Sequence, residues 1–189
     1  MSKPRRTGSE TSETRARLID VTETIMLADG YAAVSSRSVA KQAAVTPALV
    51  HYYFPTLDDL FLAVLRRRAD QQLARQDRML STERPLHALW AQSKDRDGAG
   101  LLTELMALAH HRKVVRAELA EYAERFRQVQ VTALASKIDA AGLDAPPVAL
   151  LVMIAGMARA LVLEESLGMT TGIADTYDMI DRLLDSIEP

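Results

Sequence analysis

Apolar residues recur along most of the chain at the three- and four-residue spacing of amphipathic α-helices. Leu18, Val21 and Ile25 show this spacing in a first helix, expected at residues 12–28, and Gly30 follows it as a helix stop. Further helices are expected at 37–43, at 47–53, from Leu57 onward, and at 85–95, 99–110, 113–141, 147–167 and 174–187. No segment shows the alternation of a strand, so the pattern predicts an all-α fold with about nine helices.

The two shortest predicted helices, residues 37–43 and 47–53, are separated by only three residues. Ser35 can cap the first of them with its hydroxyl group. Thr46 can cap the second, with Pro47 at the first helical position, where a missing N–H group costs nothing. Two short helices joined by so tight a link predict a helix-turn-helix.

The second short helix ends in an unusual aromatic cluster, residues 51–54. Val50 and Phe54 are four residues apart and should point inward, with Tyr53 beside them. The opposite face carries Ala48, His51 and Tyr52, with Pro47 and Leu49 at its edges. A small residue allows close approach to a DNA base, and the histidine and tyrosine can donate hydrogen bonds to bases or phosphates. An aromatic hinge that packs two domains together is the structural alternative.

With these features together, residues 30–61 (GYAAVSSRSVAKQAAVTPALVHYYFPTLDDLF) resemble the DNA-binding region of the TetR family of transcriptional regulators. The similarity extends from about Thr14 to Leu65. It implies a two-fold dimer, a recognition helix in the major groove of DNA, and a larger C-terminal helical domain for ligand binding and dimerisation. We accordingly expect a disordered basic arm at 1–11, a DNA-binding domain at 12–56, and a ligand-binding and dimerisation domain at 57–189.

The candidate DNA-contacting residues are Ser35, Arg37, Lys41, Thr46, Pro47, Ala48, Leu49, His51, Tyr52 and Tyr53. Two positions depart from the family pattern. Ala44 stands in the turn where glycine is common, and Leu57, followed by two aspartates, stands where the family often has a phosphate-binding lysine. Arg37, Lys41 and the arm residues Arg5 and Arg6 could compensate for that lysine, although each could also be an ordinary surface charge.

The C-terminal part is rich in Leu, Ala and Met, and segments 101–111 and 148–163 are apolar almost all round, so both are expected to be deeply buried. Methionine suits an adaptable apolar pocket. The candidate ligand-binding residues are Trp90, Leu102, Leu105, Met106, His110, Tyr122, Phe126, Met153 and Met157. Residues of these types at helical spacing are more often ordinary core, which is the alternative for each of them. Glu104 or Arg159 could anchor a polar end of the ligand, and Arg159 could instead form an ion pair at a dimer interface.

Composition restricts the remaining possibilities. The chain has no cysteine, which excludes disulfides and thiolate metal sites. His110 and His111 are adjacent, so on a helix they cannot chelate one metal from one face, and no phosphate-loop motif is present. Residues 1–56 carry a net charge of +2 and residues 57–189 a net charge of −4, as expected for a head that binds a polyanion. We expect a non-enzymatic protein without metal or cofactor.

The sequence therefore predicts a cytoplasmic, homodimeric repressor that binds an inverted-repeat DNA operator and is released by a small, largely apolar effector. The start of the chain lacks the apolar run of a signal peptide, and residues 148–163 are too few for a membrane span. The alternative is a helical small-molecule-binding protein whose head no longer binds DNA. Leu57 and the two aspartates after it favour that alternative.

Overall fold

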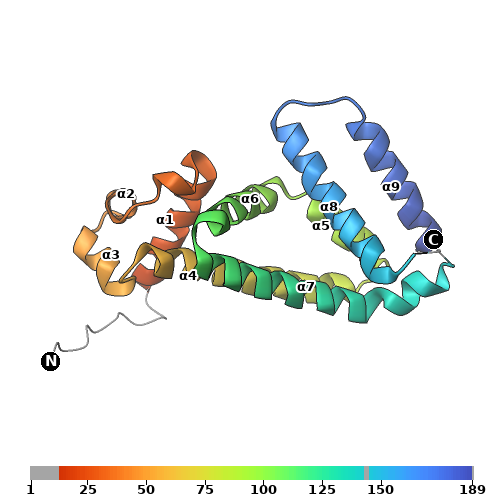
Figure 1. Cartoon of the computed structure of the whole chain (residues 1–189), viewed down its shortest axis with the longest axis horizontal. Coiled ribbons are helices and arrows are strands. Elements are labelled where there is room, and N and C mark those ends of the chain that lie inside the picture. The colour runs from red at the N-terminus through yellow and green to blue at the C-terminus, as the bar shows by residue number, and fades with distance from the viewer. Residues whose placement is uncertain (1–12, 143–144, 189) are drawn as a thin grey trace. The chain divides into compact units, whose positions relative to one another are not determined.

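The computed structural model describes residues 13–142 and 145–188. Over these residues the chain forms nine α-helices, one short 3-10 helix and no strand (Figure 1). The predicted all-α architecture is confirmed. The predicted basic arm, residues 1–11, lies outside the described residues.

The helices are α1 (Glu13–Asp29), η1 (Tyr31–Ala33), α2 (Ser36–Gln42), α3 (Pro47–Tyr53), α4 (Leu57–Leu80), α5 (Pro85–Ser93), α6 (Arg96–His111), α7 (Lys113–Ala140), α8 (Pro147–Ser166) and α9 (Ile173–Ile187). Most predicted bounds agree to within two residues. The start of α6 is the exception, because we expected a break at 95–100. Two glycines suggested that break, but Gly98 serves close packing: a Cβ atom there would lie 2.9 Å from a carboxylate oxygen of Asp95.

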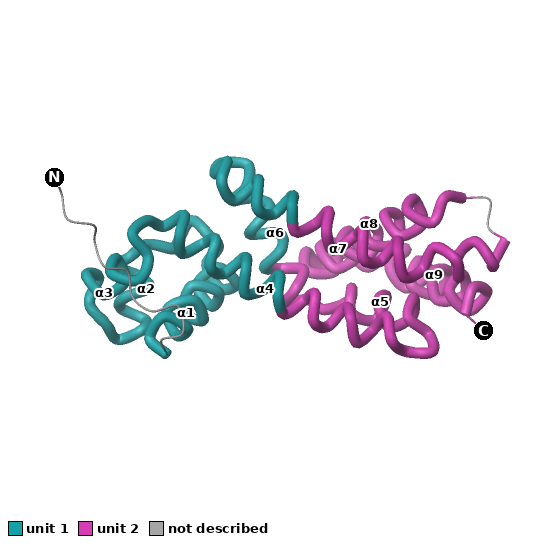
Figure 2. The backbone as a smooth tube through the Cα atoms, turned by 90° about the horizontal axis from the view of Figure 1, so that it is seen from below, with its two compact units in different colours: residues 1–70, 101–121 teal, residues 71–100, 122–189 magenta. Residues whose placement is uncertain are grey.

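The chain divides into two compact units, coloured separately in Figure 2. The N-terminal unit comprises residues 1–70 and 101–121, and the C-terminal unit comprises residues 71–100 and 122–189. Helices α4, α6 and α7 contribute residues to both units. The boundary at residue 56 that we expect from the sequence separates two tasks, DNA binding and ligand binding, and stays a prediction.

The N-terminal unit buries apolar side chains from every α-helix that it contains. Helices α1 and α2 pack against each other, as do α2 and α3. The most deeply buried residues are Leu18, Met26, Val39, Val50, Leu60, Phe61, Val64, Leu101, Leu108 and Val115. The helix-turn-helix therefore rests on residues of α1 and α4 with little freedom to move, which fixes the orientation of α3.

The C-terminal unit has a core built from α5, α7, α8 and α9. Its members include Leu86, Trp90, Leu134, Ile138, Leu150, Ala158, Leu161, Ile180 and Leu184. Helix α5 contacts both α8 and α9, and α8 contacts α9. The one tryptophan of the sequence is thus a core residue, with only 2% of its surface exposed.

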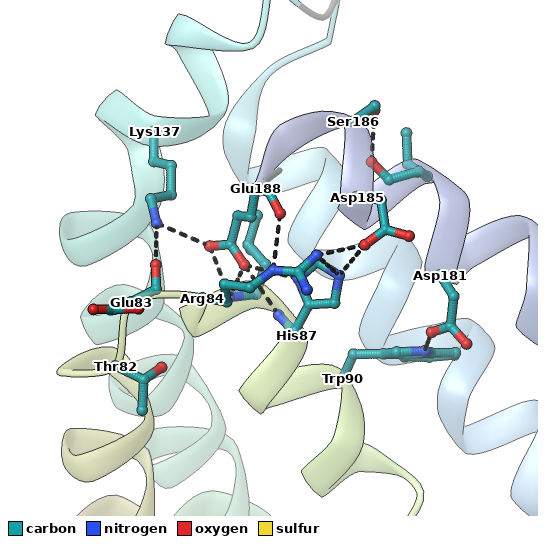
Figure 3. A network of polar contacts seen from close by, with 12 residues as sticks. Thr82, Glu83, Arg84, His87, Trp90, Lys137, Asp181, Asp185, Ser186 and Glu188 are labelled. Carbon is teal, nitrogen blue, oxygen red and sulfur yellow. Dashed lines mark hydrogen bonds and ion pairs between the residues drawn. The ribbon is translucent and has the colours of Figure 1, made fainter.

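Glu188, next to the end of the chain, caps the first turn of α5 (Figure 3). The backbone N–H groups of Leu86 and His87 donate to its carboxylate at 3.0 and 3.2 Å. Nζ of Lys137, on α7, lies 3.2 Å from the same carboxylate. A carboxylate at a helix N-terminus satisfies backbone donors that have no partner inside the helix and interacts favourably with the helix dipole. Glu188 therefore joins α5, α7 and the end of α9.

The Glu188 carboxylate is almost wholly buried, with 1% of its side chain exposed. Burial raises the pKa of this carboxyl, but hydrogen bonds from His87, two backbone N–H groups and Lys137 outweigh it, so its pKa lies below 4.5. Arg84 adds a bond from Nε to the backbone carbonyl of Glu188 at 2.9 Å and an ion pair with Asp185. The contacts form one continuous network (Figure 3).

Candidate DNA-binding site and effector region

Helix α2 begins with a reciprocal cap made by two serines. The backbone N–H of Ser38 donates to Oγ of Ser35 at 3.0 Å, and the N–H of Ser35 donates to Oγ of Ser38 at 2.9 Å. Helix α3 begins in the predicted way: Oγ1 of Thr46 accepts from the N–H of Leu49 at 3.3 Å, and Pro47 is the first helical residue. Both predicted caps are confirmed, and they explain how such short helices hold their ends.

The turn between α2 and α3 closes without glycine. Ala44 adopts a left-handed conformation with φ of 53°. The N–H of Val45 donates to the carbonyl of Ala40 at 2.9 Å, and the N–H of Ala44 donates to that of Lys41 at 3.3 Å. This is the Schellman arrangement that usually has glycine at the left-handed position. The turn keeps its geometry, and the alanine carries a strain of about 1 kcal/mol.

Helix α3 separates an inward face from an outward face as predicted. Val50 and Phe54 are 1% and 2% exposed, and Arg15 lies over the Phe54 ring at 5.0 Å. On the opposite side Ala48, His51 and Tyr52 are exposed. Tyr53 is half-buried, and its ring meets that of Tyr52 edge-on at 5.1 Å. The outward residues contribute little to the core of this chain and are free to contact another molecule.

The candidate phosphate contacts flank this face. Arg37 and Lys41, on α2, are exposed, and neither forms a salt bridge with any other residue that the structure describes. Ser35 is half-buried and its hydroxyl is engaged in capping, whereas Thr46 and Pro47 are exposed beside Ala48. Arg5 and Arg6 lie outside the described residues.

The two acidic residues after Leu57 have structural roles. Asp59 completes a cap of α4: its carboxylate accepts from the N–H of Thr56 at 2.9 Å, and Oγ1 of Thr56 accepts from the N–H of Asp59 at 3.1 Å. Asp58 forms a salt bridge with Arg112 at 2.9 Å. Their charges are therefore compensated within the N-terminal unit, so they do not indicate a head that has lost DNA binding.

Sequence reasoning missed both of these residues as structural elements. The capping pair had a recognisable signal, since a threonine followed three residues later by an acid is a common helix start. The pairing of Asp58 with Arg112 joins residues that are 54 positions apart, and no local pattern indicates it.

Within the N-terminal unit, residues of α6 and Arg112, directly after it, contact the DNA-binding head and the start of α4. The Glu104 carboxylate accepts a hydrogen bond of 2.7 Å from the N–H of Tyr31, at the start of η1. The Tyr31 ring lies 6.3 Å from the ring of His111. Arg112, which lies between α6 and α7, forms the salt bridge with Asp58 at the start of α4. Movement of α6 would therefore displace the residues that follow α1 and the residues at the start of α4.

The candidate ligand-binding residues fall into both units. In the N-terminal unit Leu105 is buried, Leu102 is half-buried, and Met106 and His110 are exposed. In the C-terminal unit Trp90 is buried in the core, Met157 packs against that core, and Met153 is 61% exposed. Tyr122 and Phe126 are half-buried, with their ring centres 5.8 Å apart and the rings tilted by 50°. The structure brings Tyr122 and Phe126 together, and it places Trp90 in the core against which Met157 packs. A role in ligand binding stays a prediction for every one of these residues.

The expected deep burial of segments 101–111 and 148–163 is wrong for the isolated chain. Helix α8 buries one side and leaves the other in solvent, where Val148, Val152 and Leu163 are 39–49% exposed. Gly156 falls between these residues on the same face. Arg159 also lies there and is exposed by surface area, although neighbouring side chains partly desolvate its guanidinium and, with the nearby Arg127, lower its pKa. By length and composition, helix α8 is apolar enough to cross a membrane. The core helices of soluble proteins meet the same criteria, so this is weak evidence for a membrane span.

The features described above agree with a known family of DNA-binding proteins. A family model for bacterial regulatory proteins of the tetR family matches residues 18–64. The match includes α2, α3 and the turn between them. Residues 18–64 are therefore a TetR-family DNA-binding domain. With this domain the protein is a transcriptional regulator that binds DNA through its N-terminal helix-turn-helix.

Solved structures of other regulators agree with this TetR-family fold along nearly the whole chain. A transcriptional regulator from Saccharomonospora viridis in complex with choline has a TM-score of 0.78 at 16% identity, covering 93% of this chain and 97% of its own. A TetR-family regulator from a Rhodococcus species has a TM-score of 0.72 at 19% identity, covering 95% and 100%. These two show the shared fold. No curated protein sequence matches significantly.

A further similar structure is the multidrug binding protein EbrR complexed with imidazole. It has a TM-score of 0.62 at 25% identity, and the match covers 100% of this chain and 98% of that one. The similarity in fold to this protein therefore extends through α9, beyond the segment that the family model matches.

Proposed function

We propose that this TetR-family protein is a homodimeric repressor that binds an inverted-repeat operator through α3 and leaves it when a small, largely apolar effector binds. The outward face of α3 carries this proposal. Ala48, His51 and Tyr52 are exposed although Val50 and Phe54, on the other side of the same two turns, are fixed in the core. A rigid helix that presents a small residue beside two hydrogen-bonding side chains suits the major groove.

Dimerisation is supported by the exposed face of α8. Val148, Val152 and Leu163 form an apolar stripe, and Gly156 within it would let a second helix approach closely. Helix α9 contacts α8 and adds Met179, which is 52% exposed. Packing α8 and α9 against their two-fold mates would form a four-helix interface and remove these side chains from water. Arg159 would lie within that interface.

Repression and release follow from the symmetry of such a dimer. Its two α3 helices would enter successive major grooves, about 34 Å apart, on one side of the operator. The effector must bind more tightly to a form in which this spacing is lost, because equal affinity for both forms shifts no equilibrium. Operator binding also places the protein in the cytoplasm.

The contacts of α6 offer a route from effector to head. An effector that displaces α6 would pull on the hydrogen bond between Glu104 and Tyr31 and so on the end of α1. It would also disturb Arg112, just after α6, and with it the start of α4 at Asp58. Similar proteins bind small organic molecules, choline in one structure and imidazole in another, which supports an effector of modest size.

The decisive experiment is selection of the purified protein on random duplex DNA at about physiological salt, followed by sequencing of the retained DNA. Enrichment of an inverted repeat with half-sites about one helical turn apart would support a two-fold DNA reader and provide the operator. Met169→Ala, in the exposed link between α8 and α9, serves as a matched control that should select the same sequence. A folded, dimeric protein that enriches no sequence would contradict the proposal.

A further inference from the structure

Lys94, directly after α5, places its charged group against two aromatic rings of the C-terminal unit. Its Nζ atom lies 4.9 Å from the ring centre of Trp90 and 4.8 Å from that of Tyr177. The rings are 5.7 Å apart and inclined at 55°, so together they form a corner that faces the ammonium. A cation within about 6 Å of a ring centre is attracted by the electron-rich ring face.

A carboxylate completes this corner. Asp181, on α9, accepts a hydrogen bond of 2.7 Å from Nε1 of Trp90 (Figure 3). The same Asp181 oxygen lies 3.8 Å from Nζ of Lys94. The bond to Asp181 increases the electron density of the indole, and the carboxylate supplies a charge opposite to that of the ammonium. Two rings and one carboxylate are the elements with which proteins recognise organic ammonium ions.

The residues around the corner hold it in shape. Burial, and secondarily Glu165, raises the pKa of Tyr177, so its ring remains a neutral phenol at physiological pH. The Tyr177 hydroxyl lies 3.4 Å from a carboxylate oxygen of Glu165, and Arg96 lies 3.4 Å from the same oxygen. Trp90 is fixed in the core. The rings are therefore positioned before any ligand arrives.

Lys94 differs from Trp90, whose ring is buried, because the lysine side chain is 37% exposed. Its stem of four methylene groups is flexible, and the carboxylate distance of 3.8 Å is long for a salt bridge. The lysine can leave the rings and hydrate its ammonium in water without unfolding any helix.

We propose that Trp90, Tyr177 and Asp181 form a binding site for an organic ammonium cation, which the ammonium of Lys94 occupies in the unliganded protein. The proposal rests on the proposed function, since it identifies the effector class as a small cation with apolar substituents. Ring faces favour a weakly hydrated cation over a metal ion, and the described residues contain no group of three side chains suited to hold a metal.

The experiment replaces the tethered cation by a free one. Lys94→Ala removes the competitor, and tetramethylammonium is the probe. Trp90 is the only tryptophan of the sequence, so its fluorescence reports on this site alone. We expect saturable binding to Lys94→Ala, at least about 10-fold tighter than binding to the wild type. tert-Butanol, a neutral molecule of similar shape, should not produce the saturable change.

Two further variants separate a binding site from a surface contact. Lys94→Arg keeps a tethered cation and should bind the probe as weakly as the wild type. Lys94→Ala combined with Tyr177→Leu loses one ring face and should lose the binding, whereas Tyr177→Phe in the same background should retain it. Circular dichroism checks that each variant is folded. If folded Lys94→Ala shows no saturable change, or responds equally to tert-butanol, the contact of Lys94 is surface packing only.

The effect on DNA is measured separately. With the operator from the selection, tetramethylammonium should weaken DNA binding by Lys94→Ala. An unchanged operator affinity at saturating probe would overturn the assignment as an effector site, although the proposed repressor function would stand. A wild type that selects no operator would remove the repressor function, while binding of the cation to Lys94→Ala would still support the site.

Discussion

In the two compact units, the residues that cap a helix lie at very different distances along the chain from the residues that they cap. In the N-terminal unit the caps of α2, α3 and α4 each join residues three positions apart, as in the pair Ser35 and Ser38. In the C-terminal unit the first turn of α5 is capped by Glu188, 102 positions away from Leu86. The head can thus form its helix ends locally, whereas α5 is completed only when the last helix has docked.

The exposed faces of the two units also differ in their chemistry. Helix α3 exposes residues that can hydrogen-bond to a polar partner, and α8 exposes valine, leucine and glycine. A hydrogen-bonding face suits DNA, and an apolar face suits a second copy of the chain. Each unit therefore has one face without a partner in the single chain, and the chemistry of the two faces points to different occupants.

The largest effect is expected from charges on the α8 face. Val152→Glu combined with Leu163→Glu should convert the dimer to a monomer, because four like charges would meet at the two-fold interface. Operator affinity should fall by more than about 100-fold although α3 is unchanged, since only one half-site is held at a time. Light scattering gives the mass, and a DNA-binding titration gives the affinity. A double variant that remains dimeric would place the interface elsewhere.

Substitutions on the α3 face should weaken DNA binding without affecting dimerisation. His51→Ala combined with Tyr52→Ala is expected to weaken operator binding by about 100-fold, with about 1–3 kcal/mol from each residue, and to leave the dimer intact. Tyr52→Phe keeps the ring and tests the hydroxyl separately. Electrophoretic mobility shift and light scattering on the same samples check both properties. Full operator affinity in the double variant would mean that another surface reads the DNA.

The long-range cap should matter more for stability than a local one. Glu188→Ala leaves two backbone N–H groups without their acceptor and removes one of the two acceptors of Lys137, so we expect a loss of about 2 kcal/mol in the free energy of unfolding. Ser35→Ala, the matched local cap, should cost about 1 kcal/mol. Urea denaturation, followed by circular dichroism, measures both. Equal losses would show that the two units do not differ in this respect.

The cap that Glu188 makes should cause the free energy of unfolding to depend on pH. The pKa of Glu188 is lowered in the folded chain, so its contribution is complete above the unfolded pKa of about 4.5 and is lost as the pH falls through the folded pKa. The advantage of the wild type over Glu188→Gln should therefore shrink on acidification below that value. Denaturation curves at pH 7 and at about pH 4 test this. An advantage that is constant with pH would exclude the carboxylate charge as its source.

The smallest effect concerns the turn of the head. Ala44→Gly should stabilise the N-terminal unit by up to about 1 kcal/mol, because glycine adopts the left-handed conformation without strain but loses more entropy on folding. Ala32→Gly, at an exposed position of η1, is the control and should destabilise. Thermal denaturation measures the difference. A destabilised Ala44→Gly variant would mean that the alanine methyl contributes packing that outweighs the strain.

Local chemistry made the head predictable from the sequence. The bounds of α3, its two faces and the caps at Ser35 and Thr46 all depend on residues within one or two turns of each other. The contacts of Glu104 with Tyr31, Asp58 with Arg112, and Glu188 with α5 join residues 54 to 102 positions apart, and no spacing rule identifies such partners. For α8, composition suggested burial, but only the packing showed which side remains exposed.

The division of α3 into two faces has a consequence for how such a protein evolves. Under the proposed function, substitutions at Ala48, His51 and Tyr52 would alter which DNA sequence is preferred without disturbing the core, because the buried Val50 and Phe54 anchor the helix from its other side. A duplicated gene could therefore acquire a new operator through a few point mutations at these surface positions. The scaffold would remain recognisable by its buried positions long after the regulated genes had changed.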